Sequence, residues 1–154
     1  MEIYQIHHKK ALSFLKTADH LTYVTLPVVA DNKLIISILD NLYRSLVHGM
    51  NTVLEHERMY KRVMPLAENF NSRFDVFRKA IIGRHGFINE EALLILELRK
   101  IVEARKESPI EFTRPGKFVI CSENYKVESI SIDEIKKYLS RTKNFMLKVN
   151  QFLK

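Results

Sequence analysis

The chain has 154 residues, and 25 lysines and arginines against 18 aspartates and glutamates give it a net charge of +7. Apolar residues make up 46% of it, enough for a core, so disorder is excluded as the main state. Four glycines, four prolines and a single cysteine (Cys121) exclude a loop-rich β-barrel, a disulfide framework and a cysteine-based zinc site. We expect a single domain over residues 1–154, with no metal and no cofactor.

The first half of the chain predicts two helices. Apolar residues at helical spacing indicate a helix over 3–24, which Pro27 should end because proline removes a backbone donor. Asp31 is a good N-cap for a long helix over 31–63. Steps of three and four residues give this helix an apolar face formed by Ile35, Leu39, Leu42, Leu46, Met50 and Val53. We interpret it as the central helix of a bundle, since further apolar residues widen this face beyond what one neighbour covers.

Two shorter helices should follow the long one. The first spans 71–83 and is expected to bury Phe74, Phe77, Ala80 and Ile81. Gly83 and Gly86 come after it, as helix C-termini often require. Asn89 should cap the next helix, whose expected core residues are Leu93, Leu94, Leu96, Leu98, Ile101 and Val102.

The end of the chain combines a hairpin with a last helix. The proline-containing stretch that starts at Ser108 indicates a loop, and 118–121 with 127–130 indicates a small β-hairpin. Ser131 and Glu134 form a capping box before the last helix. The sequence thus predicts a mostly α fold of about five helices. A bundle core with the long central helix spans 1–106, a loop and hairpin span 107–131, and a basic C-terminal helix spans 132–154.

The sequence shows no signal for secretion or for a membrane. The first residues lack a basic stretch followed by an apolar stretch, so no secretory signal is predicted. Apolar runs are only a few residues long, whereas a membrane-spanning helix needs about 20. We expect a cytoplasmic protein without a membrane partner.

More than half of the net charge lies on the last helix. Residues 132–154 hold six lysines and arginines against two acids, which gives +4. The basic residues of this face are Lys136, Lys137, Arg141, Lys143 and Lys148. Such a face can neutralise nucleic-acid phosphates, and the alternative is a solvated face that keeps the protein soluble. No aromatic residue interleaves with these positions, so base stacking is not expected there.

A polar stripe runs along the predicted long helix. Asp40, Arg44 and His48 are spaced by four residues, and Asn51 and Glu55 continue the same side. These side chains can form a ladder of ion pairs and hydrogen bonds. Alternatively, an arginine and a histidine on one face can bind a phosphate and transfer a proton. The six histidines of the chain show no metal-ligand spacing.

An arginine and a histidine at motif spacing occur in the middle of the chain. Six residues separate Arg78 from His85. With the helical layout of residues 1–106, this spacing resembles the HEPN family (higher eukaryotes and prokaryotes nucleotide-binding). The resemblance implies a small, often dimeric helical bundle that acts as an RNase or binds RNA, with Arg78 and His85 as catalytic residues at a dimer groove. In a second near-match, Arg99 to Arg105, an arginine replaces the histidine, which implies a non-catalytic member.

Three functions fit these features. We favour a non-catalytic module that binds RNA or associates with a ribonucleoprotein through the basic last helix. A second reading is a protein-interaction or structural homo-oligomeric module, because the second apolar face of the long helix needs a partner. The third is a metal-independent RNase in which Arg78 stabilises phosphate charge and His85 moves the proton. The expected partners are RNA, a second copy or another protein, and we lean towards a protein that is not an enzyme.

Overall fold

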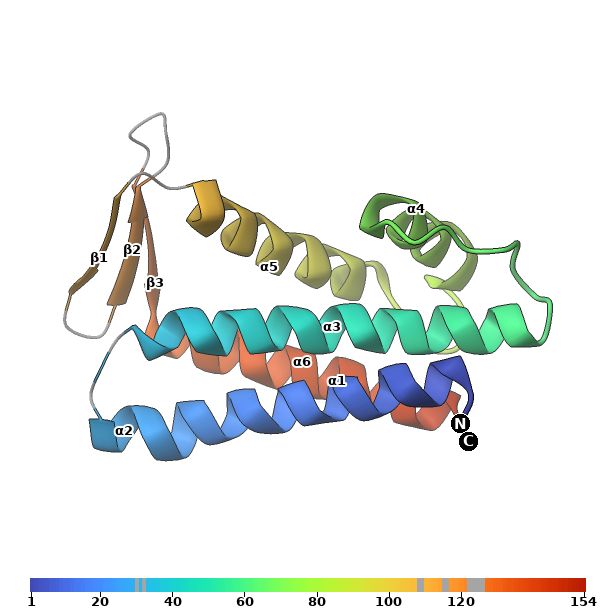
Figure 1. Cartoon of the computed structure of the whole chain (residues 1–154), viewed down its shortest axis with the longest axis horizontal. Coiled ribbons are helices and arrows are strands. Elements are labelled where there is room, and N and C mark those ends of the chain that lie inside the picture. The colour runs from blue at the N-terminus through green and yellow to red at the C-terminus, as the bar shows by residue number, and fades with distance from the viewer. Residues whose placement is uncertain (30, 32, 108–109, 115–116, 122–126) are drawn as a thin grey trace.

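The computed structural model describes the chain except residues 30, 32, 108–109, 115–116 and 122–126, and it describes side chains outside 106–129. The first helical segment is α1 (Ile3–His20), which continues through a π-helical turn, η1 (Leu21–Thr25), into α2 (Leu26–Val29). The longest helix, α3 (Leu34–Met59), packs along α1 and occupies the middle of the bundle (Figure 1).

Two further helical segments and α6 complete the bundle within the described residues. The short α4 (Phe70–Val76) runs into a second π-helical turn, η2 (Phe77–Ile81), and α5 (Asn89–Glu107) follows. The last helix, α6 (Ile132–Phe152), packs on α3 and α1 and brings the two chain ends side by side (Figure 1). The expected mostly α bundle of about five helices with a long central helix is confirmed.

The core lies where α3, α5 and α6 meet. The whole predicted apolar face of α3 is buried, and Phe145 of α6 is fully buried against it. Gly49 of α3 sets the distance between these helices. A Cβ atom there would lie 2.8 Å from Met146 Sδ and 2.9 Å from Phe145 Cε2. The missing side chain therefore lets α6 approach α3 closely.

Proline does not end the first helical segment where the sequence predicted. Helical structure continues to Val29, and Pro27 lies inside it. The turn before the proline is π-helical, with the Leu26 N–H donating to the Leu21 carbonyl five residues earlier. A widened turn gives the proline ring room and tolerates its missing donor, so the helix is adjusted rather than broken.

Other predicted helix boundaries shift by a few residues. The long helix begins at Leu34 instead of residue 31, although Asp31 Oδ1 still accepts a hydrogen bond from the Lys33 N–H at 3.0 Å. The helix predicted over 71–83 begins at Phe70, because the Asn69 side chain caps it through the Ser72 N–H at 2.8 Å. Ser131 caps α6 as predicted, by accepting from the Glu134 N–H at 3.2 Å.

Two expected core leucines of α5 are exposed. Leu93 and Leu96 are 47% and 40% exposed, whereas Leu94 and Ile95 are buried. Four consecutive apolar residues extend most of the way around a helix, which advances about 100° per residue. Only the inward part of such a run can reach the core, so Leu93 and Leu96 were wrongly placed there.

The stretch before α6 holds more strand structure than predicted. Three antiparallel strands, β1 (Ile110–Arg114), β2 (Lys117–Cys121) and β3 (Val127–Ser131), form a sheet in the order β1-β2-β3. Strands β2 and β3 pair in the predicted hairpin, with Lys117 opposite Ser131. The segment that became β1 was predicted to be a loop. It pairs with β2 from Ile110 opposite Cys121 to Arg114 opposite Lys117.

Candidate nucleic-acid interface

The basic residues of α6 divide between two sides of the helix. Lys136 and Lys143 lie towards α1, where both approach Tyr23. Arg141 and Lys148 lie towards α5, where both meet glutamates. Lys137 is exposed and forms no ion pair with any residue that the structure describes. The predicted basic face is therefore two narrower surfaces with different neighbours.

An exposed tyrosine lies on the α1 side of α6. The ammonium groups of Lys136 and Lys143 lie 5.6 Å and 5.7 Å from the centroid of the Tyr23 ring, which is within cation–π range. The Tyr23 side chain is 53% exposed. Lys143 also forms an ion pair with Asp19, with Nζ 2.6 Å from Oδ1. We call Tyr23, Lys136 and Lys143 the tyrosine–lysine surface. The sequence of α6 alone gave no reason to expect base stacking on the basic face, but the fold brings an aromatic ring from η1 beside two of its lysines.

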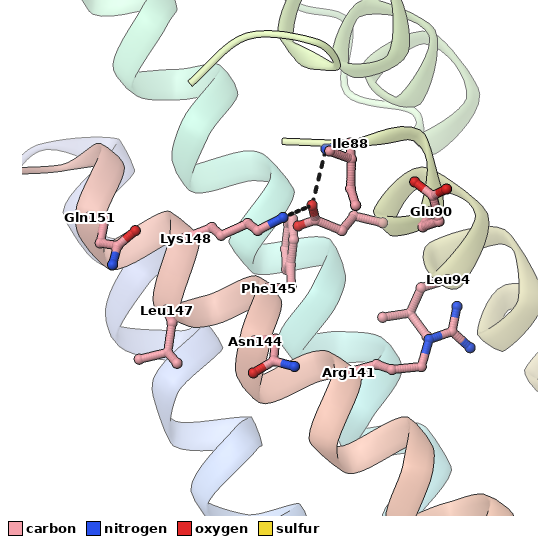
Figure 2. Close-up of a pocket in the computed structure, with 10 residues that line it drawn as sticks. Ile88, Glu90, Leu94, Arg141, Asn144, Phe145, Leu147, Lys148 and Gln151 are labelled. Carbon is pink, nitrogen blue, oxygen red and sulfur yellow. Dashed lines mark hydrogen bonds and ion pairs between the residues drawn. The ribbon is translucent and has the colours of Figure 1, made fainter. Parts of the chain in front are cut away.

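Acidic residues of α5 hold the other basic side chains. Arg141 Nη1 lies 3.2 Å from Glu97 Oε2, and Lys148 Nζ lies 2.5 Å from Glu91 Oε1. The same Glu91 oxygen accepts a hydrogen bond from the Ile88 N–H at 3.0 Å (Figure 2). These two cations are already neutralised within the chain. They contribute less free positive charge than Lys136 and Lys137 do.

The predicted polar stripe of α3 is not a continuous ladder. Asp40 and Arg44 form a loose pair at 3.9 Å near solvent. His48 turns to α1 instead, where its Nδ1 lies 2.9 Å from His7 Nδ1 and its ring stacks on Phe14 with centroids 5.5 Å apart. Arg44 also lies over the Phe14 ring, at 5.7 Å. The stripe thus joins α3 to its neighbours more than it links its own residues.

The paired histidines are held in the neutral form. Burial, followed by the charges of His7, Lys10 and Arg44, lowers the pKa of His48 from 6.5 to about 4. Burial also lowers the pKa of His7, with the Arg73 charge as the next cause. A contact between two Nδ1 atoms needs one donor and one acceptor, which two neutral rings supply. If both rings gained a second proton, both Nδ1 atoms would be donors and the contact would lose its acceptor.

The C-terminal part of the stripe, Asn51 and Glu55, binds an arginine that the sequence analysis did not identify. Arg73 of α4 is buried, and its guanidinium donates to Glu55 Oε1 at 3.0 Å and to Asn51 Oδ1 at 3.2 Å. Its Nε donates to the Ala67 carbonyl at 2.7 Å. These bonds fasten α4 and the chain before it to α3. The sequence around Arg73 did not predict a buried ion pair, because its partners Asn51 and Glu55 lie on another helix.

Arg78 and His85 lie on either side of the end of a helix. Arg78 lies in the π-helical turn, is exposed and donates to Asp75 Oδ1 at 3.3 Å. His85 follows that turn, has a positive φ of 55° and places its ring edge-on to Phe152 with centroids 5.1 Å apart. Arg78 is thus hydrogen-bonded to the Asp75 carboxylate, whereas His85 packs on the end of α6.

The described residues contain no group of three or more histidine, cysteine, aspartate or glutamate side chains that could hold a metal ion. Within the same residues, no helix has both the length and the apolar character that crossing a membrane requires. The Cys121 side chain lies outside the described part of the structure. The sequence matches no family model, and neither a curated protein nor a solved structure is significantly similar to it.

Proposed function

We propose that the chain is a non-catalytic module that binds single-stranded RNA or a ribonucleoprotein through the tyrosine–lysine surface. One observation carries this proposal. The ammonium groups of Lys136 and Lys143 lie over the exposed Tyr23 ring, each less than 6 Å from the ring centroid. Proteins that bind single strands combine an aromatic platform for a base with cations for the backbone.

The physical contributions of the two residue types differ. A base stacked on an aromatic ring contributes about 1–3 kcal/mol, and this contribution depends little on sequence. Each lysine that neutralises a phosphate releases counterions, which adds about 0.7 to the slope of log affinity against log salt for a single strand. The exposed Lys137 lies next to Lys136 in sequence and extends the positive charge. Asp19 pairs with Lys143 and reduces its contribution to phosphate binding, so Lys136 should contribute more than Lys143.

Fluorescence anisotropy with a labelled single-stranded RNA, measured across a salt series, tests the proposal. We expect Tyr23→Ala to weaken binding about 5- to 150-fold, the range that a stacking energy of about 1–3 kcal/mol gives. Lys136→Gln should lower the salt slope by about 0.7. Tyr60→Ala is the matched control, because Tyr60 is 54% exposed and Arg62 lies 5.1 Å from its centroid on another part of the surface.

The same samples separate the alternatives. RNA that stays intact on a gel and binds in a salt-dependent way supports the binding module. RNA that is cut by the parent chain, and stays intact with Arg78→Ala or His85→Ala, supports the metal-independent RNase instead. Affinity that is equal in the parent, the Tyr23→Ala and the Tyr60→Ala proteins contradicts a role for the tyrosine–lysine surface. Absence of binding at low salt contradicts the proposal as a whole.

A further inference from the structure

A pocket lies between the chain that follows α3 and the helical segment formed by α4 and η2. It encloses about 410 Å³. Its apolar lining comes from both segments and consists of Val63, Met64, Val76 and Ala80. Figure 1 shows α4 and α2 at opposite ends of the bundle, so this pocket lies far from the tyrosine–lysine surface. A pocket of about 300–1,000 Å³ with an apolar lining and a few charged groups is typical of a small-molecule site.

Positive charge is in excess around this pocket. Lys61, Arg62 and Lys79 line it, and Asp75 is the single acid among the described residues that line it. Two cations share this carboxylate, because Asp75 Oδ2 lies 3.0 Å from Lys79 Nζ and Oδ1 lies 3.3 Å from Arg78 Nη2. The hydrogen bond from Lys79 is the main cause that lowers the pKa of Asp75, so the carboxylate is charged at neutral pH. One negative charge cannot neutralise both cations.

The other two cations find no acid within the pocket. In the described part of the chain, no carboxylate pairs with Lys61. Arg62 Nη1 lies 3.1 Å from Glu57 Oε1, but the Arg62 side chain is 58% exposed, and a guanidinium has five N–H donors. The four cations around the pocket therefore exceed the two carboxylates that pair with them by two charges.

Lys61 occupies a backbone position that favours glycine. The end of α3 forms a Schellman motif, in which the Lys61 N–H donates to the Arg58 carbonyl at 2.9 Å and the Arg62 N–H donates to the Glu57 carbonyl at 2.8 Å. The motif gives Lys61 a φ of 58°, which is strained for any residue with a Cβ atom. The chain thus holds a cation at the pocket at a cost to its backbone, and such costs are concentrated at functional sites.

We propose that this pocket binds a small molecule in which a phosphate is joined to an apolar group. A phosphate monoester carries about −1.5 to −2 charges at neutral pH, which matches the excess of two positive charges. Lys61, Arg62 and Lys79 donate to the phosphate oxygens, and the apolar group packs against Met64 and Ala80. A carboxylic acid supplies only about half of this charge, so it should bind more weakly than the phosphate.

Nuclear magnetic resonance of the ¹⁵N-labelled chain, titrated with phenyl phosphate, tests the proposal. We expect chemical-shift changes at the amides of 61–64 and 75–80. Inorganic phosphate and phenol should each bind more weakly, because each supplies only one part of the ligand. Absence of changes at these amides at the highest soluble concentration overturns the proposal. Inorganic phosphate that binds as tightly as phenyl phosphate also overturns it, since the apolar lining then takes no part.

Lys61→Gly separates loss of binding from loss of folding. A hydrogen bond to a charged group is among the stronger ones, so this variant should bind phenyl phosphate about tenfold more weakly. Its melting temperature should equal or exceed that of the parent, because glycine relieves the strained backbone. Lys100→Gln is the matched control, since Lys100 is an exposed cation on α5 that does not line the pocket. Unchanged binding by Lys61→Gly, or an equal loss in Lys100→Gln, overturns the proposal.

This site and the proposed RNA binding can fail independently of one another. Tyr23→Ala removes the aromatic ring of the tyrosine–lysine surface at the other end of the bundle. It should therefore bind phenyl phosphate as tightly as the parent does. A loss of phenyl phosphate binding in Tyr23→Ala would place the anion on the tyrosine–lysine surface and contradict a site between α3 and α4.

Discussion

Replacing Arg73 by alanine should destabilise the protein strongly. The side chain of Arg73 is 9% exposed and that of Glu55 is 5% exposed, and their charged atoms lie 3.0 Å apart. Without the guanidinium, Glu55, Asn51 and the Ala67 carbonyl each lose a hydrogen-bond donor. Removing one partner of a buried ion pair costs about 3–5 kcal/mol, because the other charge stays buried without compensation.

The expected cost lies at the lower end of that range. Glu55 keeps a second cation, because its Oε2 accepts from Arg58 Nε at 2.7 Å. We therefore expect Arg73→Ala to lower the free energy of unfolding by about 3 kcal/mol and the melting temperature by about 6–12 °C. Urea unfolding followed by far-ultraviolet circular dichroism measures the first quantity, and a thermal scan measures the second.

Arg58→Ala is the matched control for this experiment. Arg58 binds the same carboxylate, but its side chain is 39% exposed, so its loss should cost less than about 1 kcal/mol. Arg73→Lys should recover only part of the stability, since an ammonium group cannot reproduce the planar set of donors. Equal losses for Arg73→Ala and Arg58→Ala would refute the argument that burial makes the difference.

Two further predictions concern helix packing and pH. Gly49→Ala places a methyl group against Met146 and Phe145, so overpacking of about 1–3 kcal/mol should outweigh the gain of up to about 1 kcal/mol in helix propensity, and urea unfolding should show a net loss. The folded pKa of His48 is about 4, below its unfolded value of 6.5, so the unfolded chain binds more protons between these values. The free energy of unfolding should therefore fall as the pH drops from 6.5 to 4, and denaturant titrations should show a smaller fall for His48→Gln; an unchanged fall would show that other groups cause it.

Local patterns in the sequence predicted much of the bundle. The apolar face of α3 repeats every three or four residues, so its burial can be predicted without knowing which helices pack against it. The Ser131 cap is equally local, because donor and acceptor are three residues apart. The π-helical turn before Pro27 was not predictable from such rules, since proline usually ends a helix. Here the helical structure continues through Pro27, in a segment that packs along α3.

The candidate surfaces were harder to predict because they combine separate helices. Tyr23 belongs to η1, yet its ring lies beside lysines that follow more than a hundred positions later. Arg73 and Glu55 similarly meet across α4 and α3. Charge counting located the basic helix correctly but could not show that Arg141 and Lys148 pair with acids of α5. Pairing of this kind depends on which faces the helices turn to each other.

The neighbouring chain ends place some of the most distant residues in the sequence in direct contact. His8 Nε2 lies 2.6 Å from Asn150 Oδ1, although 142 positions separate them, and both ends of the chain reach the same end of the bundle (Figure 1). Such a contact forms only after the ends of a long chain have met, which is entropically costly. A peptide joining residue 154 to residue 1 would make the pairing of α1 with α6 a local, hairpin-like step. Circular closure would thereby lower the contact order of the fold without altering any packed surface.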